Sequence, residues 1–335
     1  MDYEKVGQSR TYAIAMWDFS WLERPEYDDW DKSLDELQER GYDALRIECY
    51  PGLFPYTQTI DPIWDANDWG SPNAVTVESF KLHDFLAKCT GRGIKVGLAT
   101  WWRGSRPGTI EQAAKAWQTV LDSIQAHHDT ILYVDVSNEY PLNLWTPWTR
   151  RRSSTPINIL LESIDTHGLP VTYSVNQQFT TYSAGNVDML SFNIWFAALS
   201  TFYDSEHLNY SFNRFGNEGY EKLKQAEHFY RKEESHWLDI LDGIIAEAAN
   251  KSFATKLPIV TTEGWGPIDY KDYEGLDWGW VKEVCEHGVD RAARTGAWKA
   301  ICTSNFCGPQ FKGMWGDIQW HQTQTNIIKG SNYGL

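Results

Sequence analysis

The chain has 335 residues, of which 42% are hydrophobic and 22% charged, an ordinary composition for a globular protein. Acidic residues (45) outnumber basic ones (30), and the net charge of -15 disfavours nucleic acids and anionic membranes as partners. No run of about 18 apolar residues occurs, so the sequence predicts no membrane-spanning helix.

The cysteines bear on metal and redox chemistry, and the first ten residues bear on the cellular location of the protein. The five cysteines are odd in number and irregularly spaced, without a Cys-x-x-Cys pair, so neither a zinc site nor a redox motif is expected. Residues 1–10 are polar and unlike a signal peptide, which predicts a cytoplasmic protein unless a leader has been removed. We expect no metal and no cofactor, and the sequence sets no expectation for the oligomeric state.

Short β-like runs alternate with helical patterns along the whole chain. The β runs are residues 11–17, 42–47, 94–100, 131–140, 170–175, 187–195, 258–262 and 297–304. The helical patterns are residues 28–40, 77–90, 109–124, 157–166, 218–231, 236–250, 281–294 and 318–328. Eight of each, read as a regular alternation, predict an α/β fold, a (β/α)8 TIM barrel. A doubly wound sheet is disfavoured because Trp17-Asp18-Phe19-Ser20 is no Gly-rich phosphate turn.

Two long segments with many aromatic residues interrupt this alternation. Residues 51–74 and 196–235 are too long for ordinary connections, so we expect elongated βα loops that shape the rim of a cleft. The second is predicted as an insertion within a single catalytic domain of residues 1–335. The chain also holds 18 Trp and 17 Tyr against four Met, and planar apolar side chains suit contact with sugar rings.

Two of the predicted strands lead to the glutamates that are candidate catalytic residues. The run at 131–140 ends in Asn138-Glu139-Tyr140, and the run at 258–262 is followed directly by Glu263. In a parallel barrel the C-terminal ends of the strands share one face, so both glutamates should lie at the same mouth. The other candidate binding residues at that mouth are Arg46, Asn138, Trp101, Trp102, Asn193, Trp195, Trp265, Asn305 and Trp315.

Two glutamates at one mouth suit the cleavage of a glycosidic bond. One carboxyl must be neutral to protonate the leaving oxygen, and the other must be ionised to attack or stabilise the anomeric carbon. An arginine such as Arg46 beside one carboxylate lowers its pKa and thereby sets the two apart. Asp135 lies inside the 131–140 run, so we expect it to be structural, with Arg46 or a backbone donor as its partner.

These residues resemble the signature of clan A glycoside hydrolases, above all family 5 and its cellulase-like relatives. The similarity extends over about residues 11–330. It implies a retaining β-glycosidase acting on a carbohydrate, with Glu139 as the acid/base and Glu263 as the nucleophile. It further implies that Asn138 hydrogen-bonds the sugar 2-OH and that Arg46 orients the nucleophile.

Three positions depart from the family 5 pattern. Trp101 stands where a His usually follows the third strand, and residues 193–195 read Asn-Ile-Trp in place of His-x-Tyr. Asn305-Phe306 stands where a Trp usually follows the last strand, with Trp315 as a candidate replacement. The departures leave an alternative open, a carbohydrate-binding barrel that has lost hydrolysis. A lyase or aldolase barrel is disfavoured because no Lys stands at a strand end to form a Schiff base.

Overall fold

The computed structural model describes residues 9–54, 58–60, 75–102, 107–140, 155–176, 185–197, 202–203 and 217–334. Most of the predicted 51–74 loop lies outside these residues, and so does most of the first half of the predicted insertion at 196–235. The aromatic walls that we expect from these two segments therefore lie outside the described structure.

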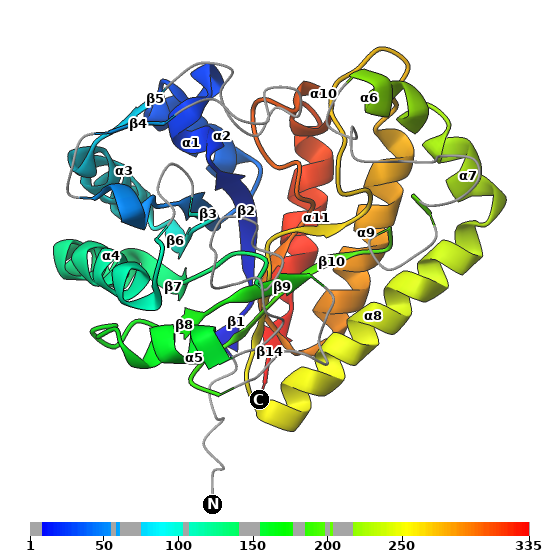
Figure 1. Cartoon of the computed structure of the whole chain (residues 1–335). Coiled ribbons are helices and arrows are strands. Elements are labelled where there is room, and N and C mark those ends of the chain that lie inside the picture. Colours follow the sequence, from blue (N-terminus) through cyan, green and yellow to red (C-terminus); the bar gives the residue numbers. More distant parts are fainter. Residues whose placement is uncertain are drawn as a thin grey trace, which may run out of the picture.

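A curled parallel sheet forms the centre of the molecule, and helices line its outside (Figure 1). Its ladder joins, in spatial order, β9 (Ser174–Asn176), β10 (Leu190–Trp195), β11 (Ile259–Thr261), β13 (Trp298–Cys302), β2 (Tyr12–Asp18), β3 (Ala44–Glu48), β6 (Lys95–Ala99), β7 (Ile131–Asp135) and β8 (Val171–Thr172). β12 (Gly264–Trp265) pairs with the end of β10. Because only Tyr173 separates β8 from β9, both ends of the ladder reach the same stretch of chain. This arrangement is consistent with a TIM-like glycosidase fold.

The strands are buried on both faces, as their apolar and β-branched runs predict for a parallel sheet. Every residue of β3, β7 and β10 is buried. Small residues make room for large ones inside the sheet, since a Cβ on Gly97 of β6 would lie 2.5 Å from the ring of Tyr133 on β7. Arg46 is fully buried in the same interior and therefore needs polar partners there.

The helices of the first half lie close to their predicted positions. α2 (Trp30–Glu39), α3 (Ser79–Arg92), α4 (Ile110–Ser123) and α5 (Thr155–Glu162) follow β2, β3, β6 and β7 in turn. Short helices α1 (Ser20–Glu23), η1 (Pro25–Tyr27), η2 (Pro51–Leu53) and η3 (Gln125–Thr130) fill the connections. Thr109 caps α4 by accepting a hydrogen bond from the backbone N–H of Gln112 at 3.3 Å.

The predicted regular alternation is wrong in the second half. Among the described residues, no helix lies between β9 and β10, whereas α6 (Asn217–Leu223), α7 (Ala226–Lys232) and α8 (Glu234–Thr255) all lie between β10 and β11. The extra helices come from the segment predicted as an insertion, which is helical from residue 217 onward. α9 (Gly279–Thr295), α10 (Lys312–Trp315) and α11 (Ile318–Gly330) complete the outer layer.

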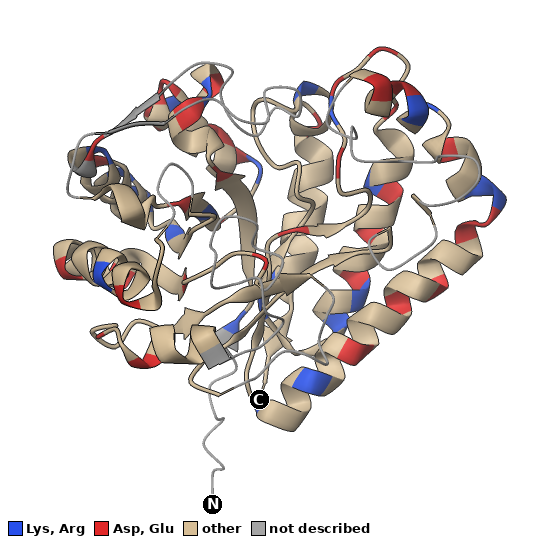
Figure 2. Ribbon diagram, viewed as in Figure 1, with Lys and Arg blue, Asp and Glu red and all other residues tan. Residues whose placement is uncertain are grey.

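Two small antiparallel pairs lie outside the central sheet. β1 (Ser9–Arg10) pairs with β14 (Asn332–Tyr333), and β4 (Gln58–Ile60) pairs with β5 (Val75–Val77) within the region predicted as a long loop. Charged residues stand mainly on the outer helices, while the central strands carry few (Figure 2). Within the described ranges, no helix combines the length and the hydropathy needed to cross a membrane.

Candidate active site

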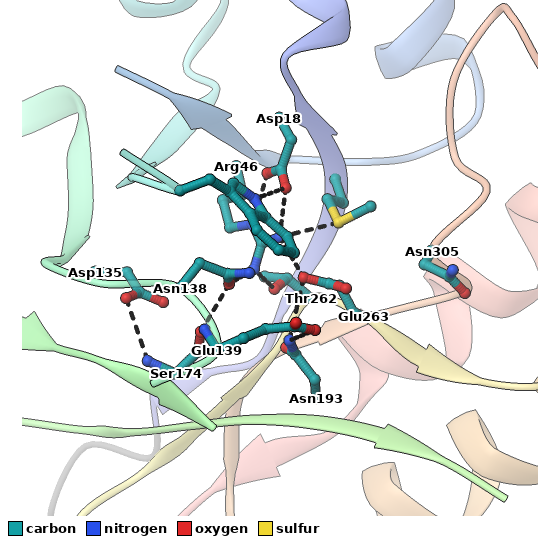
Figure 3. Close-up of polar contacts among 12 residues, drawn as sticks. Asp18, Arg46, Asp135, Asn138, Glu139, Ser174, Asn193, Thr262, Glu263 and Asn305 are labelled. Carbon is teal, nitrogen blue, oxygen red and sulfur yellow. Dashed lines mark hydrogen bonds and ion pairs between the residues drawn. The ribbon is translucent and has the colours of Figure 1, made fainter. Parts of the chain in front are cut away.

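A buried arginine joins two carboxylates at the C-terminal end of the sheet. Arg46 of β3 donates from Nε and Nη2 to the two carboxylate oxygens of Asp18, at 2.8 and 2.7 Å. Its Nη2 also donates to Oε1 of Glu263 at 2.5 Å (Figure 3). Asp18 ends β2, and Glu263 lies two residues after the end of β11, so the guanidinium of Arg46 on β3 connects the ends of three strands of the ladder.

The third nitrogen of the guanidinium, Nη1, also has hydrogen-bond acceptors. Nη1 of Arg46 donates to Oδ1 of Asn138 at 3.0 Å and to Oγ1 of Thr262 at 2.6 Å. Although burial lowers the pKa of Arg46, the carboxylates of Asp18 and Glu263 outweigh this effect and raise it well above its ordinary value. Arg46 is therefore a permanent positive charge at the centre of the cluster.

The two predicted glutamates meet at the side chain of Asn193. Glu139 lies beyond the end of β7, Glu263 follows β11, and Asn193 stands on β10. Nδ2 of Asn193 lies 3.4 Å from Oε1 of Glu139 and 3.1 Å from Oε1 of Glu263 (Figure 3). These two oxygens are therefore no further apart than the sum of the two distances, 6.5 Å.

The environments of the two glutamates differ. Glu263 is only 6% exposed, whereas Glu139 is half-buried. Burial raises the pKa of Glu263; Arg46 opposes this rise, while the charges of Glu139 and Asp18 add to it. Burial is the largest of these effects, and Arg46, which also pairs with Asp18, offsets only part of it, so the pKa of Glu263 stays above its ordinary value.

Glu139 is held in an unusual backbone conformation. Its φ is 52°, in the left-handed region that costs a non-glycine residue roughly 1–2 kcal/mol. Its backbone N–H donates to Oγ of Ser174 at 2.8 Å, and that hydroxyl donates to Oδ1 of Asn138 at 2.7 Å. Because Arg46 and Ser174 both engage Oδ1 of Asn138, the orientation of this amide is set by the protein.

We expected either Arg46 or a backbone donor as the partner of Asp135, and the structure shows backbone donors. Its Oδ1 accepts the backbone N–H groups of Ser137 and Ser174, each at 3.2 Å. Burial raises the pKa of Asp135 to about 6, while Arg46 and these donors oppose the rise. The carboxyl thereby links the end of β7 to β9 and supports the turn that carries Glu139.

Among the predicted tryptophans, Trp101 lies at the carboxylate cluster. It is half-buried, and its indole Nε1–H donates to Oδ2 of Asp18 at 2.7 Å. Its ring packs against Phe19 with the ring centroids 5.9 Å apart. Trp101 therefore places an N–H donor beside Asp18 at the position where the family 5 pattern has a His.

Three of the predicted sugar-binding tryptophans are not placed in the site. Trp102, Trp265 and Trp315 are buried in the hydrophobic core. The indole of Trp265 donates to the carbonyl oxygen of Cys302 at 3.0 Å, and Trp315 lies against Arg40, whose Cζ is 4.2 Å from the ring centroid. A strand end predicts where a backbone lies, but successive side chains point to opposite faces, and Trp265 of β12 points toward α9. Trp315 lies in α10 and not at a strand end.

The last two candidates are buried near the strand ends. Trp195 ends β10 and is paired in register with Trp265 of β12. Asn305 donates from Nδ2 to the carbonyl oxygen of Ile268 at 3.0 Å and lies apart from the two glutamates in Figure 3. Asn305 thus supports the loop after β12 and does not contribute to the cluster around Arg46.

Besides Asp18, three further polar residues of the cluster were not predicted as site residues. Thr262 and Ser174 bind Arg46 and Asn138 as described above, and Oδ1 of Asn176 accepts a hydrogen bond from Nδ2 of Asn193 at 3.3 Å. Thr262 and Asn176 stand at strand ends, so the rule that selected the glutamates also covers them. No group of three or more His, Cys, Asp and Glu residues in the described part of the chain is placed to hold a metal ion.

Comparisons with known proteins identify the family. The profile of the Cellulase-like family, described as sugar-binding cellulase-like, matches residues 14–329. A solved structure from Parabacteroides distasonis ATCC 8503, whose name assigns it provisionally as a glycoside hydrolase, is 38% identical in sequence. The alignment covers 98% of this chain and 96% of that one, with a TM-score of 0.91. No curated protein matches the sequence at a significant level.

More distant structures share the fold. A GH5_18 variant from Bifidobacterium longum, solved in complex with Manβ1-4GlcNAc, has 13% identity and a TM-score of 0.55, with 96% of this chain and 78% of that one covered. The exo-β-1,4-mannosidase of Opitutaceae bacterium strain TAV5 has 10% identity and a TM-score of 0.56, with 98% and 63% covered. At such identities the likeness concerns the fold alone. The chain belongs to the cellulase-like family, and its fold is that of family 5-like clan A glycoside hydrolases.

Proposed function

We propose that this protein is a retaining glycoside hydrolase that cleaves a β-glycosidic bond in an oligosaccharide or simple glycoside. The supporting observation is the approach of Glu139 and Glu263 to the same Asn193 nitrogen, which limits the distance between their Oε1 atoms to 6.5 Å. Retaining enzymes hold the two carboxyl groups about 5–5.5 Å apart and inverting ones about 6.5–9.5 Å apart. The two Oε1 atoms would be 6.5 Å apart only if the Asn193 nitrogen lay on the straight line between them, so their approach favours retention over inversion.

The two carboxyl groups differ in burial and in their contact with Arg46, and this difference supports the division of roles between them. Glu263 is buried against the guanidinium of Arg46, which stabilises its carboxylate form and fixes the oxygen that would attack. Glu139 is more exposed than Glu263, so it suits exchange of a proton with a leaving group or with water. We therefore assign Glu263 as the nucleophile and Glu139 as the acid/base.

The reaction proceeds in two half-reactions. In the first, an oxygen of Glu263 attacks the anomeric carbon while the proton of Glu139 passes to the glycosidic oxygen, and the aglycone leaves. In the second, Glu139 takes a proton from water, whose oxygen attacks the anomeric carbon and releases Glu263 as a carboxylate. Two inversions at the same carbon return the sugar with its original β configuration.

The residues around the glutamates suit the recognition of a sugar. Arg46 and Ser174 orient the amide of Asn138, which we propose as the group that hydrogen-bonds the sugar 2-OH. Trp101 offers a half-buried ring at the same strand ends. The two distant structures are named for, or bound to, β-mannosides, so a substrate panel should pair β-mannosides with β-glucosides.

Hydrolysis of nitrophenyl glycosides by two glutamate variants tests the assignment. Glu263→Gln should lose activity on every substrate because no glycosyl ester can form. Glu139→Gln should lose about 10²–10⁴-fold with a poor leaving group, yet keep much of the first half-reaction with dinitrophenolate, which needs no protonation. Glu247→Gln, on the exposed face of α8, is the control and should match the unmodified protein. Full activity in both site variants would refute the assignment.

A carbohydrate-binding barrel without hydrolysis is the second candidate. It is favoured by the departures at Trp101 and Asn193 and by the description of the family as sugar-binding. Calorimetric binding of an oligosaccharide, combined with no turnover of any activated aryl glycoside between about pH 4 and 9, would support this function over hydrolysis.

A further inference from the structure

A third glutamate, which is fully buried, lies beside the site and has no part in the proposed reaction. Glu48 is the last residue of β3, two positions after Arg46, and it is fully buried. Its Oε1 accepts the backbone N–H of Tyr50 at 2.8 Å, and its Oε2 accepts the backbone N–H of Trp101 at 2.5 Å. The carboxyl thus ties the end of β3 to the turn that follows β6.

A continuous series of contacts leads from Glu48 to the proposed nucleophile. The backbone of Trp101 is held by Glu48, and its indole N–H donates to Oδ2 of Asp18 at 2.7 Å. The same oxygen of Asp18 accepts Nη2 of Arg46 at 2.7 Å, and that Nη2 donates to Glu263. The indole and the guanidinium therefore share one oxygen, so a shift of the indole changes how strongly Asp18 holds Arg46.

Packing alone does not account for a carboxyl at this place. Burial raises the pKa of Glu48 to about 8, against the opposing hydrogen bonds from the backbone of Trp101 and Tyr50 and from Thr100. Placing an ionisable group in such surroundings costs free energy that an apolar side chain of the same size avoids. The group nevertheless supplies two acceptor oxygens to N–H groups from two different strand ends.

We propose that Glu48 is a positioning residue for Glu263, acting through Trp101, Asp18 and Arg46. Glu48 holds the backbone of Trp101 and thereby keeps the indole N–H hydrogen-bonded to Asp18. Because the same oxygen of Asp18 binds Arg46, this hydrogen bond limits how strongly Asp18 attracts the guanidinium and leaves Nη2 directed at Glu263. The inference rests on the proposed function in so far as Glu263 is the nucleophile. The contacts themselves are independent of that function.

A double-mutant cycle tests the kinetic part of the proposal. In Glu48→Gln, one oxygen becomes an NH2 group, so one of the two N–H donors loses its acceptor. We expect kcat on an activated aryl glycoside to fall about 10- to 100-fold with KM within about twofold. Trp101→Phe, which lacks the indole N–H, should show a similar fall. The double variant should be no worse than the worse single variant, because both changes break the same series of contacts.

Glu23→Gln is the matched control for this cycle. Glu23 is also buried, and it accepts the hydroxyl of Tyr50 at 2.8 Å, so it touches the same neighbour without a described contact to Trp101. We expect its kcat to be unchanged. Effects of Glu48→Gln and Trp101→Phe that multiply in the double variant would overturn the proposal, as would an equal loss of kcat in Glu23→Gln.

A spectroscopic measurement separates this proposal from the proposed function. In protein labelled with 5-fluorotryptophan, the signal absent from Trp101→Phe identifies Trp101 in the ¹⁹F NMR spectrum. Glu48→Gln should move that signal and Glu23→Gln should not, whether or not the protein hydrolyses glycosides. An unmoved signal refutes the positioning role. If Glu48→Gln does not fold, Glu48→Asp replaces it; the shorter carboxylate should move the same signal, and an unmoved signal would again refute the role.

Discussion

At the scale of single residues, the charge balance around Glu263 predicts the pH dependence of activity. Burial raises the pKa of Glu263, Arg46 lowers it, and Glu139 and Asp18 raise it further. Attack requires the carboxylate, which is lost as the pH falls through this raised pKa. The acid limb of kcat/KM for an activated glycoside should therefore lie above the ordinary range of a glutamate, about pH 4.3.

Asp18→Asn should move that acid limb to lower pH. The change removes one negative charge that raises the pKa of Glu263. It also leaves Glu263 as the carboxylate that pairs with Arg46, in place of the two that share it now. We expect kcat to fall as well, because the contacts of Asp18 with Trp101 and Arg46 weaken. Asp43→Asn is the control, since Asp43 pairs with Arg10 at the opposite end of the sheet. A limb that stays in place or moves upward would contradict this charge balance.

At the scale of elements, two helical glycines predict opposite effects of the same substitution. A Cβ on Gly288 of α9 would lie 2.4 Å from Cγ of Trp265, whereas a Cβ on Gly243 of α8 would meet nothing within 4 Å. Gly288→Ala should therefore lower the free energy of unfolding by about 1–3 kcal/mol through overpacking. Gly243→Ala should raise it by about 0.5–1 kcal/mol, because alanine favours a helix.

Urea unfolding of both variants, followed by tryptophan fluorescence, measures this difference. Each variant is the control for the other, since residue type, substitution and helical setting are the same. Equal stabilisation of the two variants would show that α9 moves away from the sheet without loss. That result would contradict the tight packing of Trp265 of β12 against α9.

The elements also show what a sequence can and cannot predict here. Alternation of β runs and helices predicted the strand ends, and this alone gathered Glu139, Glu263 and Arg46 at one end of the sheet. Side-chain direction was not predictable, because the apolar runs of a fully buried sheet carry no alternation to show which residue faces inward. Trp265 was expected at the mouth for that reason, yet it packs under α9. The role of Glu48 depends on a contact across 53 positions of sequence, which no local pattern carries.

At the scale of the whole molecule, the proposed site and the junction of the chain ends occupy opposite ends of the sheet. The glutamates lie at the C-terminal strand ends, whereas β1 pairs with β14 beside the starts of β2 and β13. The backbone N–H of Thr11 donates to the carbonyl oxygen of Ser331 at 3.4 Å, and that of Gly334 donates to Gly296 at 3.2 Å. This junction therefore holds the first and last parallel strands together.

Removal of residues 331–335 should weaken the fold without changing the chemistry. The deletion takes away β14 and the backbone hydrogen bonds around it, each of which contributes about 0.5–1.5 kcal/mol. We expect the midpoint of urea unfolding to fall, while kcat on the best aryl glycoside stays within about twofold at temperatures far below the melting point. Removal of residue 335 alone, which lies beyond β14, is the control and should change neither quantity. If the longer deletion lowered kcat at full folding, the two ends of the sheet would be coupled, and the carboxylate geometry would depend on the strand junction at the far end of the sheet.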